Sequence, residues 1–150
     1  MGSILIERDR TEIENRLRSL SSSSTGKWGS LDVAGMLKHL RLSASMALGE
    51  TELPSSNKRA FQVFPLKHLI LYVFPFPKGA PTAPGLKPGS VDAASFEDER
   101  KVLIELLDRI GSGPKEGAGP SHPLFGPLTR SEWGVVTYKH TNHHLKQFGA

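Results

Sequence analysis

The chain has 150 residues, enough for an ordinary hydrophobic core, and we expect residues 1–150 to form a single domain. Hydrophobic residues make up 37% and charged residues 23% of the sequence, a balance typical of a globular protein and not of a disordered or fibrous one. The net charge of +4 comes from Lys and Arg residues interleaved with Asp and Glu. We therefore expect no nucleic-acid partner, which would need a basic stripe.

Membrane and thiol chemistry are also disfavoured. The longest apolar stretch, residues 61–76, is interrupted by Pro65, Lys67 and Pro75, so we expect no membrane span. Charged residues at positions 7–10 follow the first apolar residues directly, unlike a secretory signal, and we expect a cytoplasmic protein. The sequence has no cysteine, so a bound metal would take nitrogen or oxygen ligands.

Two helices are predicted in the first third of the chain. Residues 4–20 carry apolar side chains at helical spacing among charged ones. After a Ser-rich break at residues 21–24, Ser30 is a candidate N-cap for a second helix. This helix should run to about Leu48 and end at Gly49.

The middle of the chain alternates between apolar and irregular segments. Residues 66–74 are nearly all apolar and favour a short buried helix over an exposed strand. The prolines and glycines of residues 75–89 forbid a regular element. A further helix fits residues 92–110, with Val102 on its apolar face, and Gly111 should stop it.

The C-terminal part combines a loop with a long helix. The loop that ends at Leu128 is rich in Gly and Pro, and we expect it to be irregular. Thr129 and Glu132 form a capping box at the start of a helix that runs to about Phe148. The fold class expected is all-α, a bundle of four principal helices with long Pro/Gly-rich loops packed over one end.

Two histidines of the last helix share one face. At about 100° per residue, His140 and His144 lie about 40° apart and one turn from each other, so both rings can reach one metal ion. The pair of His140 with His143 has a wider separation but is not excluded. Trp133 and Val136 point in a similar direction, which places His140 and His144 on the buried arc of the helix.

A third nitrogen ligand has to come from another helix. His39 is the natural candidate, because it lies in the middle of the second helix, within or at the edge of its buried arc. A single buried histidine is more often a core residue held by a hydrogen bond. Two on one buried arc and a third on another helix favour a metal centre.

The surrounding residues limit the kind of metal centre. A His-Glu-x-x-His protease would need a carboxylate where Thr141 stands. A di-iron bundle would need several inward-facing glutamates, which the pattern does not provide. Three neutral imidazoles suit zinc or nickel. Gln147 lies on the same arc as His140 and could orient a ligand or substrate through its amide.

Several motifs along the chain also resemble those of a known family. They are Lys27-Trp28-Gly29, Met36-Leu37-x-His39-Leu40, Pro75-Phe76-Pro77-Lys78-Gly79-Ala80-Pro81-Thr82, His122-Pro123-x-Phe125-Gly126 and Trp133-Gly134-x-x-x-Tyr138-x-His140-x-x-His143-His144-x-x-Gln147-Phe148-Gly149. Together they resemble the DinB/YfiT-like superfamily of metalloenzymes, and most closely an uncharacterised bacterial branch of it, a domain of unknown function.

The resemblance has implications for fold and chemistry. It implies a four-helix bundle of up-down-down-up topology in which His39, His140 and His144 bind a divalent metal. Better-known members are metal-dependent S-transferases and isomerases that use a low-molecular-weight bacterial thiol, with nickel or zinc at the site. Other members have no assigned activity, so the resemblance bears more on the fold and the site than on the reaction.

The first function considered is that of an enzyme, a metal-dependent hydrolase or thiol S-transferase acting on a small molecule. The metal would acidify a water molecule or an external low-molecular-weight thiol. His143 could act as an acid or base beside the site, although packing is its commoner role. Lys78 and Lys87 could attract an acidic substrate, and His122 could close over the site, although a loop-anchoring role is favoured for it.

The alternative is a non-catalytic, stress-associated module that binds a metal or another ligand without turnover. Structural zinc sites usually have four protein ligands, so three histidines count against a purely structural metal. Whether the site is catalytic stays open at this stage. The assembly stays open between a monomer and a homodimer, because bundles of this kind often dimerise but no surface patch identifies an interface.

Overall fold

The computed structural model describes residues 2–54, 59–79, 82 and 84–150. It is mostly helical, as predicted, but it also contains a two-stranded antiparallel sheet, so the expected all-α class is wrong. The elements are α1 (Glu7–Ser19), α2 (Val33–Ala47), α3 (Leu66–His68), α4 (Phe96–Ser112), β1 (Ala118–His122), β2 (Gly126–Thr129) and α5 (Arg130–Gln147). Two residues of the central motif, Ala80 and Pro81, lie outside the described residues.

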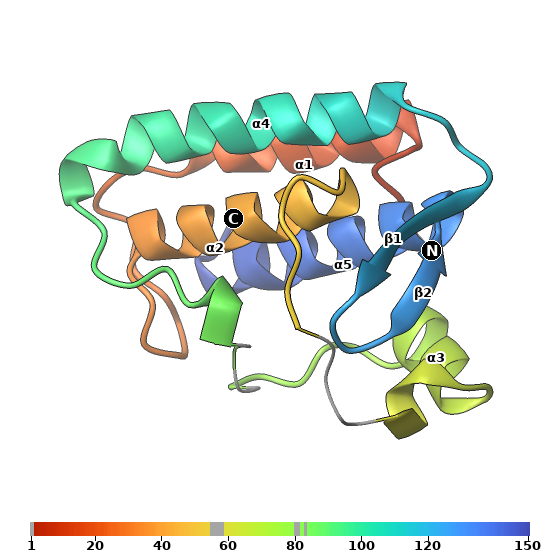
Figure 1. Ribbon diagram of the computed structural model, residues 1–150. Coiled ribbons are helices and arrows are strands. Elements are labelled where there is room, and N and C mark those ends of the chain that lie inside the picture. Colours follow the sequence, from red (N-terminus) through yellow and green to blue (C-terminus); the bar gives the residue numbers. More distant parts are fainter. Residues whose placement is uncertain (1, 55–58, 80–81, 83) are drawn as a thin grey trace.

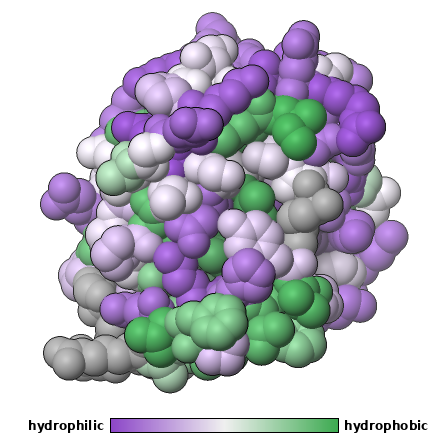
Figure 2. All heavy atoms as spheres, turned by 90° about the vertical axis from the view of Figure 1, so that its right-hand side faces the viewer, coloured by the Kyte–Doolittle hydropathy of each residue, from purple (hydrophilic) through white to green (hydrophobic). Residues whose placement is uncertain are grey.

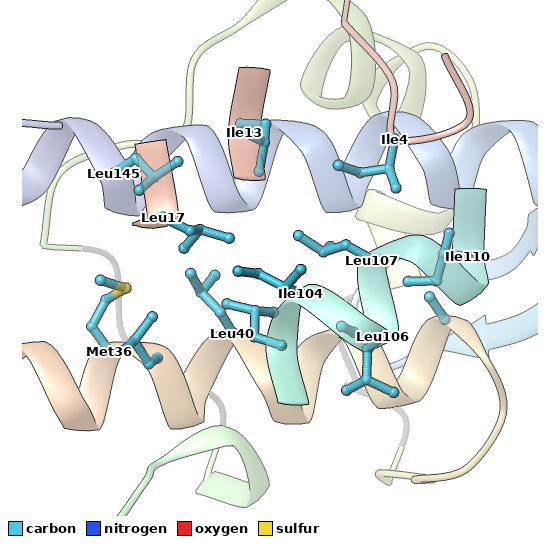
Figure 3. Packing of buried hydrophobic residues seen from close by; sticks show 14 of the residues in the cluster. Ile4, Ile13, Leu17, Met36, Leu40, Ile104, Leu106, Leu107, Ile110 and Leu145 are labelled. Atoms are coloured by element: carbon cyan, nitrogen blue, oxygen red, sulfur yellow. The ribbon is translucent and has the colours of Figure 1, made fainter. Parts of the chain in front are cut away.

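The four long helices lie in two layers. Figure 1 shows α1 and α4 next to each other above α2 and α5, and each layer contacts the other. Their apolar side chains point toward one another in the interior (Figure 3). Ile13, Leu17, Leu107 and Leu145 are all completely buried there. Burial of each such side chain contributes on the order of 1.5 to 3 kcal/mol, so this shared core fixes the spacing of α2 and α5.

Of the two N-terminal caps predicted from the sequence, the structure has one as predicted and replaces the other. The capping box before α5 is confirmed, with the Thr129 hydroxyl accepting from the Glu132 N–H and the Glu132 carboxylate accepting from the Thr129 N–H. The N-cap of α2 is Asp32 and not Ser30, because the Asp32 carboxylate accepts from the Gly35 N–H at 2.6 Å. An ionised carboxylate at a helix N-terminus also interacts favourably with the helix dipole.

The segment before α5, predicted to be irregular, is a β-hairpin. Strands β1 and β2 pair with Ser121 opposite Pro127 and His122 opposite Gly126. The hairpin packs on the start of α5, where the Trp133 indole N–H donates to the Pro120 carbonyl at 2.8 Å. Gly119 lets the strand approach this ring, since a Cβ there would lie 2.6 Å from Trp133. Contacts with the helix that follows it therefore stabilise a segment whose composition alone indicates a loop.

Two further predictions are corrected by burial and helix length. The segment 66–74 is helical, with α3 continuing as a π-helix over Leu69–Val73, but Leu71 is its only buried residue among those described. Ile70 and Tyr72 are partly buried against the core, whereas Val73 and Phe74 are more than half exposed. Apolar atoms gather along the lower edge of the face in Figure 2. Helix α4 continues through Gly111, and Val102 is 38% exposed because it lies outside the core-facing stripe. No helix within the described ranges is long and apolar enough to span a bilayer.

Candidate metal centre

Helices α2 and α5 bring three histidines together. His39 lies in the middle of α2 and is 4% exposed. His140 and His144 lie one turn apart on α5, which packs against α2. One ring nitrogen from each histidine lies within 4.8 Å of the other two, a spacing that allows all three to hold one metal ion. Ring centroids are separated by 4.8 Å for His39 and His140, 5.0 Å for His39 and His144, and 4.9 Å for His140 and His144.

Each of the three rings is held by a hydrogen bond at Nδ1. The Nδ1–H of His39 donates to the Leu86 carbonyl at 2.8 Å, and that of His144 donates to Oε1 of Gln147 at 2.7 Å. Nδ1 of His140 lies 3.1 Å from the Ser43 hydroxyl. These contacts leave Nε2 of each ring for the centre, where the Nε2 atoms of His39 and His140 are 2.9 Å apart. Such outer partners orient metal-ligating histidines and set their tautomers.

Burial keeps the triad uncharged. It lowers the pKa of His39 and lowers that of His140 well below the ordinary value, with a further decrease from the neighbouring His39 and His144. The pKa of His144 is lowered to about 4, first by burial and then by His39. Neutral imidazoles are the form that binds divalent metals. The donor set therefore fits a metal ion that takes nitrogen ligands at neutral pH.

Gln147 links the triad to the loop before α2. Its Oε1 accepts from His144, and its Nε2–H donates to the Trp28 carbonyl at 2.5 Å. Gly29 adopts a positive φ of 80°, and a Cβ at this position would lie 2.6 Å from Nε2 of Gln147. Glycine is therefore needed both for the backbone and for the space that Gln147 occupies.

His143 lies beside the triad and not within it. Its ring meets the His144 ring edge-on, with centroids 5.3 Å apart, and the Trp28 ring at 6.0 Å. The metal-competent pair on α5 is thus His140 with His144, and the alternative pairing with His143 is not the one that the fold brings to His39. Phe76 covers the same side, 6.2 Å from the His140 ring and 6.3 Å from the His143 ring.

The two remaining histidines have other positions. His122 anchors the hairpin, because its Nδ1 accepts from the backbone N–H groups of Leu124 and Phe125 at 3.0 and 3.3 Å. This agrees with the loop-anchoring role favoured from the sequence. His68 is exposed on α3, and its ring contacts that of Tyr72 at a tilt of 42°.

Sequence reasoning gave four groups of the site no role in it. Ser43 carried a usable signal, since it lies four residues after His39 and hence on the same face of α2. The Leu86 carbonyl and the Phe76 ring come from the Pro-rich loop, whose path no periodicity reveals. Trp28 belongs to a motif noted in the sequence, and its buried indole N–H has no hydrogen-bond partner within the described part of the chain.

Comparison with known proteins gives one match. Residues 6–150 match the model of a family described as a protein of unknown function (DUF1569). No curated protein and no solved structure matches the chain. The family match covers the triad and almost the whole chain, and it assigns no reaction to either.

Proposed function

We propose that this chain, which belongs to the DUF1569 family of unknown function, is a DinB-like metalloprotein. Its His39, His140 and His144 would bind one zinc or nickel ion. We propose further that it is a metal-dependent hydrolase or thiol S-transferase acting on a small molecule. The observation that carries the proposal is the convergence of three imidazoles, that of His39 buried and those of His140 and His144 partly buried, whose Nδ1 atoms all have outer hydrogen-bond partners.

The proposed fold is an up-down-down-up bundle of α1, α2, α4 and α5, with α3 and the hairpin as additions. Two observations support it. The four helices share one core, and α2 and α4 are joined by a long connection that includes the Pro-rich loop, as two consecutive helices of like direction would need. A metal site between facing helices is also a common feature of such bundles.

An open coordination site supports catalysis over a structural role. Within the described ranges, His39, His140 and His144 form the only cluster of three or more potential ligands, and no fourth ligand joins them. Catalytic zinc sites commonly have three protein ligands and one open position, whereas structural sites have four. When bound, the ion would act as a Lewis acid that lowers the pKa of a water molecule or an external thiol.

The remaining residues of the site would position groups and move a proton. The pKa of His143 is lowered by burial and by the nearby Lys146 and Lys78, so this ring is neutral at pH 7 and able to accept a proton. Gln147 is a positioning residue that holds the ring of His144. Phe76 covers the rings of His140 and His143 and limits the access of bulk water.

Elemental analysis of the protein purified without a histidine tag tests the metal site. We expect about one zinc or nickel ion per chain, and loss of this ion in His39→Ala and in His144→Ala. His68→Ala is the matched control, because this histidine is exposed on α3 and should leave the metal content unchanged. Unchanged metal content in His39→Ala would refute the ligand set.

Turnover is tested separately with the metal-loaded protein. A panel of low-molecular-weight thiols is mixed with chlorinated and epoxide electrophiles, and thiol loss is followed; ester and amide hydrolysis is measured in parallel. Activity that disappears in His144→Ala supports the enzyme. Failure with every metal and substrate, together with a sharp loss of stability on chelation, would instead support the non-catalytic stress-associated module.

A further inference from the structure

A groove lies between α5 and residues 73–76. Its volume is about 280 Å³, close to the lower end of the range for small-molecule pockets. On α5 it is lined by positions 138, 139, 142, 143 and 146, which recur at helical spacing and form one face. Phe74 and Phe76 lie on the opposite side and give the groove an aromatic wall.

The groove borders the metal centre. His143 lines it and meets His144 edge-on, with ring centroids 5.3 Å apart. Phe76 lines it as well and lies 6.2 Å from the ring of His140. A molecule in the groove would thus be one side chain away from the triad.

The charge around the groove is positive. Lys139 and Lys146 line it, and the Lys78 ammonium lies 4.4 Å from the centre of the Trp28 ring, which packs on His143. No described lining residue is acidic. Among the residues that the structure describes, Lys67 on α3 is the only lysine paired with a carboxylate. Lys139 and Lys146 therefore line the groove and Lys78 lies near its His143 side, and none of the three is paired with a described carboxylate.

Lys139 is the most constrained of these cations. Its ammonium donates to the carbonyls of Ile70 and Leu71 and lies 5.0 Å from the centre of the Phe76 ring. These contacts use two of its three N–H groups and leave one for a ligand. Two acids of α1 act on Tyr138, which lines the groove, and both are already paired: Glu12 with Arg16 at 3.3 Å and Asp9 with Arg8 at 3.0 Å.

We propose that this groove binds the anionic end, a carboxylate or a phosphate, of a small molecule with an aromatic or apolar body. The lysines supply the attraction for the anion, and Phe74 and Phe76 supply the surface for the body. The inference rests on the proposed function in one respect, namely that the bound molecule is the substrate of the adjacent metal centre. Binding itself does not require the metal.

Titrations of the full chain followed by amide ¹H–¹⁵N correlation spectra test this proposal. The probes are phenylacetate, phenyl phosphate and the neutral phenylacetamide, at one ionic strength. We expect saturable shifts in the amide signals of residues 73, 74, 76 and 138–146 with the two acids, and at least tenfold weaker binding of the amide. The ratio between the acids identifies carboxylate or phosphate as the preferred group. Equal affinity for phenylacetate and phenylacetamide would overturn the proposal.

Two charge reversals and a triad variant separate the groove from the metal. Lys146→Glu should weaken phenylacetate binding about fivefold or more, whereas Lys101→Glu, an equal charge change on the exposed side of α4, should change it less than twofold. His39→Ala should still bind phenylacetate. Loss of binding in His39→Ala with retention in Lys146→Glu would mean that the acids coordinate the ion. That result would refute the groove and leave the proposed metal site standing.

Discussion

The Ser43 hydroxyl lies 3.1 Å from Nδ1 of His140, and the tautomers of the two neighbouring rings decide its role. His39 donates from Nδ1 to the Leu86 carbonyl, so its Nε2 is an acceptor. The 2.9 Å contact between the Nε2 atoms then requires His140 to donate from Nε2 and to accept from Ser43 at Nδ1. An ion bound at Nε2 of His140 would require the opposite tautomer. A hydroxyl serves both tautomers, because it donates and accepts.

Removal of the Ser43 hydroxyl should therefore weaken metal binding. We expect Ser43→Ala to reduce zinc affinity by about 10- to 100-fold, the usual range for loss of an outer hydrogen-bond partner. Competition with a chromophoric chelator measures this. Ser45→Ala is the control, because Ser45 is equally buried on α2 but donates to the Arg41 carbonyl. Equal effects of the two substitutions would contradict the assigned role.

Gly29 supports the site through Gln147. Gly29→Ala forces an alanine into a positive φ, at a cost of about 1 kcal/mol, and also places a Cβ 2.6 Å from the Gln147 amide. Gly89→Ala introduces the same type of backbone strain at a φ of 67° with no atom within 4 Å of the new Cβ. In urea unfolding at neutral pH, Gly29→Ala should lower the free energy of unfolding more than Gly89→Ala does. Only Gly29→Ala should weaken zinc binding. Equal decreases in unfolding free energy and in zinc affinity for the two variants would show that Gln147 is not displaced.

At the scale of elements, the hairpin depends on an uncharged histidine. The His122 ring contacts the rings of Phe125 and Trp133, and its Nδ1 accepts two backbone hydrogen bonds. Burial lowers its pKa from 6.5 to about 4. The folded protein therefore resists protonation at His122 while the unfolded chain accepts the proton. The contribution of neutral His122 to the free energy of unfolding is fully present above pH 6.5, and it is lost as the pH falls from 6.5 toward 4.

The effect of this histidine on stability can be isolated by substitution. His122→Asn retains a carbonyl that can accept from the backbone two residues on, but it does not titrate. Between pH 7 and pH 4 we expect wild type to lose up to about 3 kcal/mol more unfolding free energy than His122→Asn. Urea unfolding of the chelator-treated proteins across this range measures the difference. Parallel curves would mean that His122 is charged or solvated in the folded protein.

Local patterns predicted the long helices but not the elements that depend on contacts between elements. The stripes of α1 and α5 and the Thr129 capping box follow from helical periodicity and hydrogen-bond chemistry. The hairpin forms because Trp133 holds the Pro120 carbonyl from another element, which no local pattern contains. Segment 66–74 was predicted to be buried from its composition. It is buried only in part, because Leu71 lies in the core, Ile70 and Tyr72 pack at its edge, and Val73 and Phe74 turn to the surface.

The site divides in the same way. The proximity of His140 and His144 follows from their spacing of four residues in one helix, so it could be predicted from the sequence alone. The approach of His39 to this pair depends on how α2 packs against α5. The sequence indicated His39 as the third ligand but did not predict its distance from the other two rings. The Leu86 carbonyl was unpredictable, because a backbone group on an irregular loop has no residue-type signal.

At the scale of the whole molecule, the triad joins two helices that are far apart in the chain. His39 and His140 are separated by 101 positions, and α2 and α5 also contact each other and flank the same core. A metal ion that binds only when these helices are packed binds the folded state and not the unfolded one. Metal binding should therefore stabilise the entire core, in proportion to the logarithm of free metal over Kd.

Thermal unfolding with and without zinc tests this linkage. At free zinc of 100 times Kd, the stabilisation should be about 2.7 kcal/mol, which for 150 residues corresponds to a rise in Tm of about 5 to 10 °C. His144→Ala should lose this response while His143→Ala keeps it, because only His144 belongs to the triad. Magnesium should have no effect on any of these proteins, since it prefers oxygen ligands. A zinc response that survives in His144→Ala would place the ion elsewhere and remove the link between the triad and the stability of the core.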